Sequence, residues 1–165
     1  MMQDLKARLN PLFLIVHKSG SFHREEHAAF EQLGLPYALV HLELTNCYRL
    51  YDADDSKLAA FRGLLARDNE NANRGILLTT GNVNDTFLQR HSMGTPRAIE
   101  VNVERNTVNF TLDQFSEQVL KLTKLDWNTL ATSVREPITI KCSNVAAKLA
   151  ASGFDKVIYD VRDLI

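Results

Sequence analysis

The pattern of apolar and polar positions in the first third of the chain predicts a strand, a helix and a second strand. Residues 12–17 (LFLIVH) form a short apolar run whose length favours a buried strand over a helix. Gly20 predicts a turn, and Ser21 is expected to cap a helix over residues 23–33. Residues 37–44 (YALVHLEL) predict the second strand. This order predicts two parallel strands joined by a right-handed crossover.

The middle of the chain gives weaker patterns. Residues 48–51 are compatible with a short edge strand, and residues 56–66 (SKLAAFRGLLA) have the apolar spacing of an amphipathic helix. The polar tract at residues 67–75 (RDNENANRG) predicts a mobile loop. Residues 75–80 (GILLTT) then predict another strand.

The last third shows clearer periodicity. Residues 97–104 (RAIEVNVE) alternate apolar and polar positions, as a half-buried strand does. Thr111 is expected to cap a helix over residues 112–125, with an apolar face. Pro137, as a first helical residue, predicts a final helix over residues 138–151. The elements together predict one α/β unit.

Composition limits the class of protein without identifying it. The chain has 165 residues, of which 45% are hydrophobic, so one folded domain is expected. Its net charge of −1 gives no general support to nucleic-acid binding, and an anion site would need a local cluster of cations. Cys47 and Cys142 have no metal or redox spacing, which fits a reduced cytoplasmic protein. No transmembrane or secretory segment is evident, so no membrane partner is expected.

Four collinear segments resemble the C-terminal half of the PIWI domain of prokaryotic Argonaute proteins. They are HKSGSFHREE, RGILLTTG, MGTPRAIEV and LTKLDWNTLATSVREPITIKCSNVAAKLA. The resemblance spans about residues 12–151, with residues 152–165 as a tail, and implies that residues 1–165 are a single partial PIWI domain. It implies an RNase H-like mixed α/β sheet with flanking helices. The first half of that domain and the MID domain have no counterpart in this sequence, so a partner chain that supplies both is expected.

The resemblance also implies that the chain does not cleave nucleic acid. In cleaving family members, an aspartate after the basic pair at the end of the first strand binds a divalent metal ion. Ser19 occupies that position, and Asn144 occupies the position of the metal ligand on the last helix. Two neutral side chains thus stand at metal-ligand positions of the family. The family's other metal-binding acids have no counterpart in this sequence, so no side-chain metal site is expected. From the residues alone, Ser19 could equally be a turn residue and Asn144 an exposed polar residue of a helix.

The activity that the resemblance leaves is binding of guide-strand phosphates. Cations together with free N–H groups at a helix N-terminus form an anion site that positions a strand without reading its bases. For each lysine, solvated surface is the alternative. The candidate contacts are Lys124, Asn128, Arg135, Thr139 and Lys141, with Thr123 as a further hydroxyl group.

The C-terminal residue is a second feature that the resemblance singles out. In family members, the terminal carboxylate helps to hold a metal ion that bridges to the 5′ phosphate of the guide, so Ile165 and Mg²⁺ are the corresponding residue and cofactor. A frayed terminus is the alternative. The function implied is guide-directed defence against foreign nucleic acid, with RNA or DNA as guide and target. A nuclease half-domain completed by a partner chain, or a truncated remnant without function, are the other hypotheses.

Overall fold

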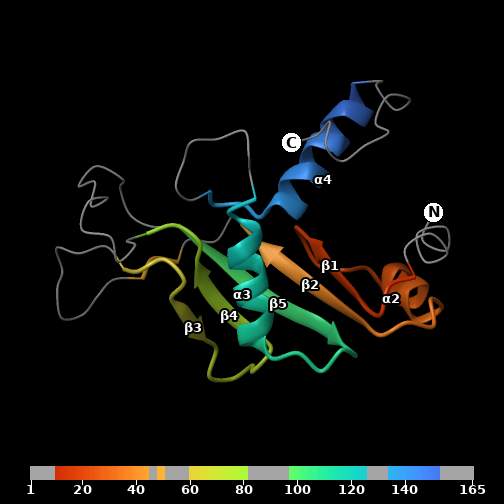
Figure 1. Ribbon diagram of the computed structural model, residues 1–165, viewed down its shortest axis with the longest axis horizontal. Coiled ribbons are helices and arrows are strands. Elements are labelled where there is room, and N and C mark those ends of the chain that lie inside the picture. Colours follow the sequence, from red (N-terminus) through yellow and green to blue (C-terminus); the bar gives the residue numbers. More distant parts are fainter. Residues whose placement is uncertain (1–9, 45–47, 51–59, 82–96, 126–133, 153–165) are drawn as a thin grey trace.

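The computed structural model describes residues 10–44, 48–50, 60–81, 97–125 and 134–152 (Figure 1). In these residues, five strands form one sheet in the order β1-β2-β5-β4-β3. β1 and β2 are parallel, and all other neighbouring strands are antiparallel. The predicted α/β class, a mixed sheet with flanking helices, is therefore confirmed. The elements are β1 (Leu14–Lys18), α2 (Arg24–Glu31), β2 (Tyr37–Glu43), β3 (Leu65–Arg67), β4 (Arg74–Leu78), β5 (Ala98–Asn106), α3 (Leu112–Leu122) and α4 (Ile138–Ala151).

The strand–helix–strand unit at the start of the chain forms as predicted, with one correction. β1 pairs with β2 in parallel register, with Leu14 opposite Tyr37. Ser21 does not cap α2, because the helix begins later and its N-cap residue is His23. The His23 backbone N–H instead donates to the carboxylate of Glu26, at 2.7 Å. Phe22, between Ser21 and the cap, is buried against β2, and this burial sets where the helix can begin.

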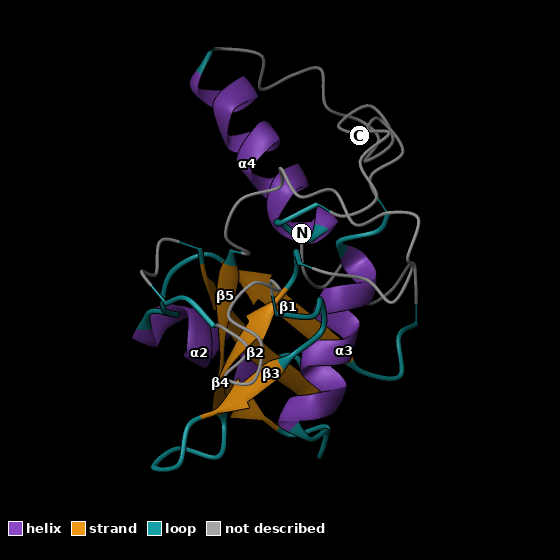
Figure 2. Cartoon of the chain, turned by 90° about the vertical axis from the view of Figure 1, so that its left-hand side faces the viewer, coloured by secondary structure: helices purple, strands orange, loops and turns teal. Residues whose placement is uncertain are grey.

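The two faces of the sheet carry different helices, as Figure 2 shows: α2 covers one face and α3 the other, while α4 extends away from the sheet. The face under α3 holds the larger apolar core, in which strand residues pack against the fully buried Phe115 and Val119 of α3. The face under α2 holds a smaller cluster. Its buried members are Phe22, Tyr37 and Leu39, joined by the partly buried Leu14, Val16 and Phe30.

The middle of the chain departs from the prediction. The helix expected over residues 56–66 is wrong for its described part, because residues 65–67 are β3, which forms a hairpin with β4. Gly63 adopts a φ of 91°, which a right-handed helix does not allow, and its N–H donates to the carbonyl of Leu78 at 2.8 Å. Residues 48–50 form no strand. The polar tract closes the β3–β4 turn, with side chains of Asp68 and Asn71 accepting from backbone N–H groups two residues later.

The last third follows the prediction closely. β5 alternates between buried and more exposed residues along most of its length. Thr111 is the N-cap of α3, and its hydroxyl accepts from the backbone N–H of Gln114 at 3.3 Å. α4 has the predicted bounds, although Pro137 is its N-cap residue and not its first helical residue. Cys142 on α4 is a free cysteine, and Cys47 lies outside the described residues.

Candidate nucleic-acid interface

One end of the sheet collects most of the residues singled out from the sequence. Because β1 and β2 are parallel and β5 runs against them, the C-terminal ends of β1 and β2 lie beside the N-terminal end of β5. The C-terminal end of α3 and the N-terminal end of α4 meet the sheet at this same end (Figure 1). We call this region the α4 end; it comprises Lys18, Leu44, Ala98, Thr123 and Ile138 with their neighbours.

A hydrogen bond between His17 and Thr139 joins β1 to α4. The His17 Nδ1 atom lies 3.0 Å from Thr139 Oγ1, and the His17 Nε2 atom is buried and has no hydrogen-bond partner among the described residues by the distance and angle of its contacts. Burial lowers the pKa of His17 to about 4, and the Gln118 side chain of α3 offsets this in part. His17 is therefore neutral at pH 7 and adds no positive charge to the α4 end. The predicted contact residue Thr139 is exposed, but its hydroxyl is already engaged with β1.

The expected metal-ligand positions carry neutral oxygen atoms in the structure. Ser19 is exposed just beyond β1, while the preceding Lys18 turns toward α2, where its Nζ atom lies 2.5 Å from Glu26. Asn144 is exposed on α4, five residues after Thr139 and therefore ~7.5 Å further along the helix axis. A hydroxyl and an amide are weak ligands for Mg²⁺, which prefers charged oxygens. These two residues do not fit a catalytic magnesium site.

The arrangement of potential metal-binding side chains is known for residues 10–44, 48–50, 60–81, 97–125 and 134–152. Within those ranges, no group of three or more His, Cys, Asp or Glu side chains is arranged to hold a metal ion. Ile165 lies outside the described residues, so a Mg²⁺ ion at the C-terminal carboxylate stays a prediction. Asn128 lies outside them as well.

Arg135 lies at the α4 end, where it ties two strands together. Its Nη2 atom donates to the carbonyl of Leu44, after β2, and lies 3.4 Å from the carbonyl of Ala98, the first residue of β5. Burial, together with the like charges of Arg97 and Arg49, lowers the pKa of Arg135, while Glu136 acts in the opposite direction. Arg135 thus has both a structural role and a positive field around it.

The two candidate lysines lie on either side of Arg135 along the chain. Lys124 is exposed directly after α3. Lys141 is partly buried in the first turn of α4, where its backbone N–H donates to the carbonyl of Pro137 at 3.1 Å. The structure therefore brings Lys124, Arg135, Thr139 and Lys141 to one end of the sheet.

Thr123 is a wrong prediction, and Arg62 is a residue that the sequence pattern did not reveal. Thr123 is only 1% exposed, and its hydroxyl donates to the carbonyl of Leu120 at 2.7 Å. The same hydroxyl accepts from Arg62 Nη2 at 2.7 Å, so it cannot contact a ligand. Arg62 also donates to the carbonyls of Thr79 and Leu120 and fastens the end of α3 to β4. A single arginine inside the apolar stretch LAAFRGLLA was the available signal.

The sequence predicts no transmembrane segment. Within the described ranges, no helix is long and apolar enough to cross a membrane.

The sheet order and the helices that flank it define a mixed α/β fold, and this fold has known counterparts. No family model matches the chain, and no curated protein matches it. Among solved structures, Aa-Ago with externally bound siRNA superimposes with a TM-score of 0.68 at 22% identity over 92% of this chain. Clostridium butyricum Argonaute, bound to a guide DNA and a target DNA, gives a TM-score of 0.65 at 15% identity over 92% of this chain.

A third Argonaute gives the same result. Marinitoga piezophila Argonaute, in complex with a 5′ OH guide RNA, gives a TM-score of 0.64 at 17% identity over 89% of this chain. The chain spans about a fifth of the length of these proteins, covering 20%, 19% and 21% of them respectively. The described fold is therefore that of one part of an Argonaute protein.

Proposed function

We propose that this chain is the nucleic-acid-binding, non-cleaving C-terminal half of a PIWI domain, and that it acts in guide-directed defence against foreign RNA or DNA. The observation that carries the proposal is the likeness in fold to Argonaute proteins over about nine-tenths of the chain. Those proteins are described with siRNA, with guide and target DNA, or with guide RNA. Guide and target nucleic acids are the corresponding partners here.

The distribution of charge at the α4 end supports contact with a phosphate backbone. Lys124 offers an exposed ammonium group after the end of α3, Arg135 lies at the same end of the sheet, and Lys141 adds a third cation in the first turn of α4. The first intrahelical bonds of α4 come from Ile140 and Lys141 to Pro137, so earlier N–H groups of the helix have no intrahelical acceptor. Cations beside a helix N-terminus attract phosphate without regard to base sequence.

The absence of cleavage rests on the chemistry of Ser19 and Asn144. An aspartate at position 19 would bring a full negative charge to a dication, whereas the Ser19 hydroxyl brings none. Two-metal phosphodiester cleavage needs several carboxylates around the two ions. Because Ser19 and Asn144 are both neutral and exposed, they support binding without hydrolysis.

The edge of the sheet supports a further segment that completes the domain. Leu14 donates its N–H to the carbonyl of Pro36, so the backbone groups of Ile15 and His17 point to the outer edge of β1. Both faces of β1 are apolar, with Ile15 in the larger core and Val16 in the smaller cluster. A strand that is apolar on both faces is typical of the interior of a sheet. We infer that the first half of the PIWI domain, with the MID domain, adds there, either from a longer chain or from a partner.

The test is fluorescence anisotropy of labelled RNA and DNA strands, with and without a 5′ phosphate, titrated with the chain between about 50 mM and 200 mM salt. We expect affinity to fall with salt, with a slope of ~0.7 per phosphate contacted. Mg²⁺ is expected to strengthen binding of the 5′-phosphorylated strands alone, as a Mg²⁺ ion at the Ile165 carboxylate would. Lys124→Gln should weaken binding. Lys121→Gln is the matched control, since Lys121 is paired with Glu117 on the outer face of α3.

Two outcomes would contradict the proposal. Binding that is absent, or that does not depend on salt, for every strand would refute a phosphate-binding role. Mg²⁺-dependent cleavage of a guide–target duplex by the purified chain would refute the non-catalytic assignment and favour the nuclease alternative.

A further inference from the structure

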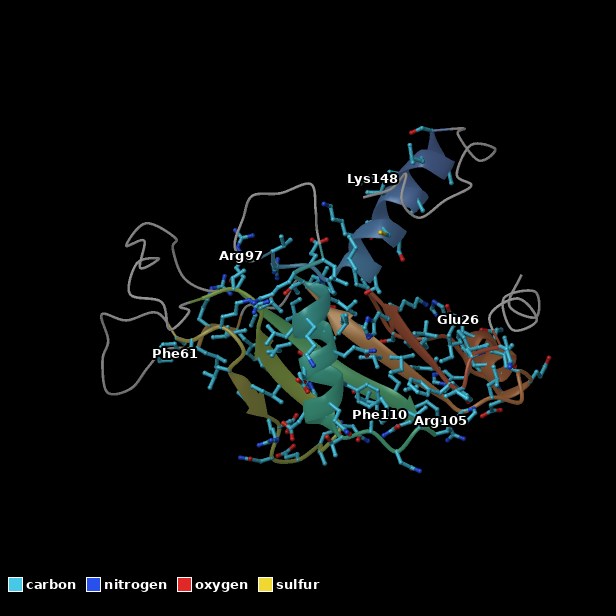
Figure 3. All side chains as sticks on the ribbon, viewed as in Figure 1. Glu26, Phe61, Arg97, Arg105, Phe110 and Lys148 are labelled. Carbon is cyan, nitrogen blue, oxygen red and sulfur yellow. The ribbon has the colours of Figure 1, made fainter. Side chains whose placement is uncertain are left out.

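Three arginines from distant parts of the chain converge at the α4 end. Arg135 Nη2 lies 3.4 Å from the carbonyl of Ala98, the residue that follows Arg97. Leu50, which follows Arg49, packs against a small apolar cluster whose buried members are Ala60, Leu78 and Ala98. Arg49, Arg97 and Arg135, which we call the arginine cluster, therefore border the same part of the sheet. Figure 3 shows Arg97 at this end of the molecule.

Within the described residues, Arg49 and Arg97 differ from other arginines of the sheet, which have acidic partners. Arg67 pairs with Asp113 at 2.6 Å, and Arg74 pairs with Glu100 at 2.7 Å. Within the described part of the chain, neither Arg49 nor Arg97 takes part in an ion pair.

The three arginines of the cluster repel one another. The like charges of Arg97 and Arg49 lower the pKa of Arg135 after burial has already done so, and Glu136 offsets this only in part. Grouping cations in this way is unfavourable unless an anion lies between them. The chain as a whole has a net charge of −1, so the cluster is a local concentration of positive charge and not part of a generally basic surface.

The three arginines of the cluster differ in their exposure. Arg135 uses Nη2 for the backbone carbonyls at the ends of β2 and β5. Among the described residues, the Arg97 backbone N–H donates to Thr80 Oγ1 at 3.0 Å, and the Arg97 side chain is exposed. Arg49 is exposed too, and one of its N–H groups donates to the carbonyl of Tyr48 at 2.8 Å. Arg49 and Arg97 are the exposed members of the cluster, whereas the Nε atom of Arg135 is buried, so Arg49 and Arg97 are the two that a ligand can reach.

We propose that Arg49 and Arg97 hold a phosphate of a nucleic-acid backbone, and that Arg135 is the residue that positions them. A guanidinium group offers parallel N–H donors that match two phosphate oxygens. Arg135 fixes the ends of β2 and β5 relative to each other, and through Ala98 it fixes the position of Arg97. This inference rests on the proposed function and extends the interface from the α3–α4 side to the N-terminal end of β5.

The experiment compares Arg49→Gln, Arg97→Gln and the double variant with Arg105→Gln in the anisotropy assay. Arg105 is the matched control, because it is an exposed arginine near the opposite end of β5 from Arg97 (Figure 3). We expect each of the two cluster variants to lose roughly tenfold in affinity at low salt. We expect the salt slope to fall by ~0.7 for each arginine removed, equally for strands of different sequence. Thermal melting temperatures and the binding of Arg105→Gln should stay at the wild-type values.

Arg135→Gln tests the positioning role separately. It should lower the salt slope in the wild-type background but leave the slope unchanged when Arg49 and Arg97 are already replaced. A purely structural role would lower the melting temperature and leave the slope unaltered in both backgrounds, which would overturn this assignment.

The remaining outcomes distinguish failure of this inference from failure of the proposed function. If the wild-type chain binds with salt dependence and the Arg49→Gln/Arg97→Gln variant binds equally well, the cluster is not a phosphate site and the proposed function stands. If the wild-type chain binds no strand, both are refuted. Polyglutamate serves as a second probe in the same assay. If the double variant loses binding to polyglutamate but not to the oligonucleotides, the ligand of the arginine cluster is an acidic protein and the inference is overturned.

Discussion

Acidification below pH 6.5 is expected to destabilise the fold through His17. Burial between β1 and α4 lowers the pKa of His17 from 6.5 to about 4. Between these two pH values the unfolded chain binds a proton on His17 that the folded chain does not bind. The stability that the neutral ring contributes is therefore complete above pH 6.5 and is lost progressively as the pH falls to about 4.

The magnitude of this effect follows from the difference between the two pKa values. A difference of about 2.5 units corresponds to ~3 kcal/mol, at ~1.36 kcal/mol per unit. This is a large share of the ~5–15 kcal/mol by which domains are stable. Among the described residues, the polar groups named beside the ring are the neutral side chains of Thr139 and Gln118, and the hydrogen bond to Gln118 offsets only part of the hydration that the charged form loses on burial.

The assay is urea unfolding followed by circular dichroism at several pH values from 7 to 4.5, for the wild-type chain and for His17→Gln. Glutamine keeps a polar group near Thr139 but does not titrate. The free energy of unfolding of the wild type should fall more steeply on acidification, by most of the ~3 kcal/mol. The carboxyl of Glu26 does not interfere, because its pKa is lowered by the His23 N–H and by Lys18, and its contribution is lost only below its ordinary pKa of 4.5.

The reasoning is refuted if the free energies of unfolding of the wild type and of His17→Gln fall by the same amount between pH 7 and pH 4.5. It is equally refuted if an NMR titration of the imidazole carbon-bound protons of folded His17 gives a pKa near the ordinary 6.5.

Two further predictions concern residues that hold the middle of the chain. Arg62→Met should lower the free energy of unfolding in urea by ~2–4 kcal/mol, because the carbonyls of Thr79 and Leu120 lose a charged donor. A loss no larger than that of a substitution at an exposed residue would contradict the structural role of Arg62. Gly81→Ala should cost ~1–3 kcal/mol, since its φ is 137° and an added Cβ would lie 2.5 Å from the carbonyl oxygen of Ala60. Gly20→Ala is the control, with φ of 99° and open space around it, and equal costs for the two variants would show that the close contact is unimportant.

The sequence predicts best those strands and helices that are buried on one face, because burial of one face leaves a periodic pattern of apolar residues. β5 alternates in sequence because the face under α3 is buried, and α3 has a capping threonine and an apolar stripe that packs on that face. The apolar spacing around β3 also fits one face of a helix, and for this reason the sequence wrongly predicts a helix there. Its strand conformation depends on pairing with β4 and on the positive φ of Gly63, neither of which leaves a local pattern.

The candidate site was predictable only in part, for the same physical reason. The resemblance led to Lys124, Arg135 and Thr139 because they lie near one another in sequence, and the structure brings them to the α4 end. The engagement of Arg135 with two strand ends depends on sheet order, which brings β2 next to β5. Arg49 and Arg97 are far apart in the sequence, and both come close enough to Arg135 to act on its pKa, so no spacing rule could group them.

The alternation of β1 explains why Ser19 alone does not decide what the α4 end does. His17 faces α4 and Lys18 faces α2, so Ser19 is the first residue beyond the strand that is free to meet solvent. An acid at that position would add one charge, and within the described residues no three His, Cys, Asp or Glu side chains are arranged to hold a metal ion. Metal-assisted cleavage requires such a set, whereas backbone binding requires cations whose donors are free. Arg49, Arg97 and Lys124 are exposed cations of the kind that the second requirement names.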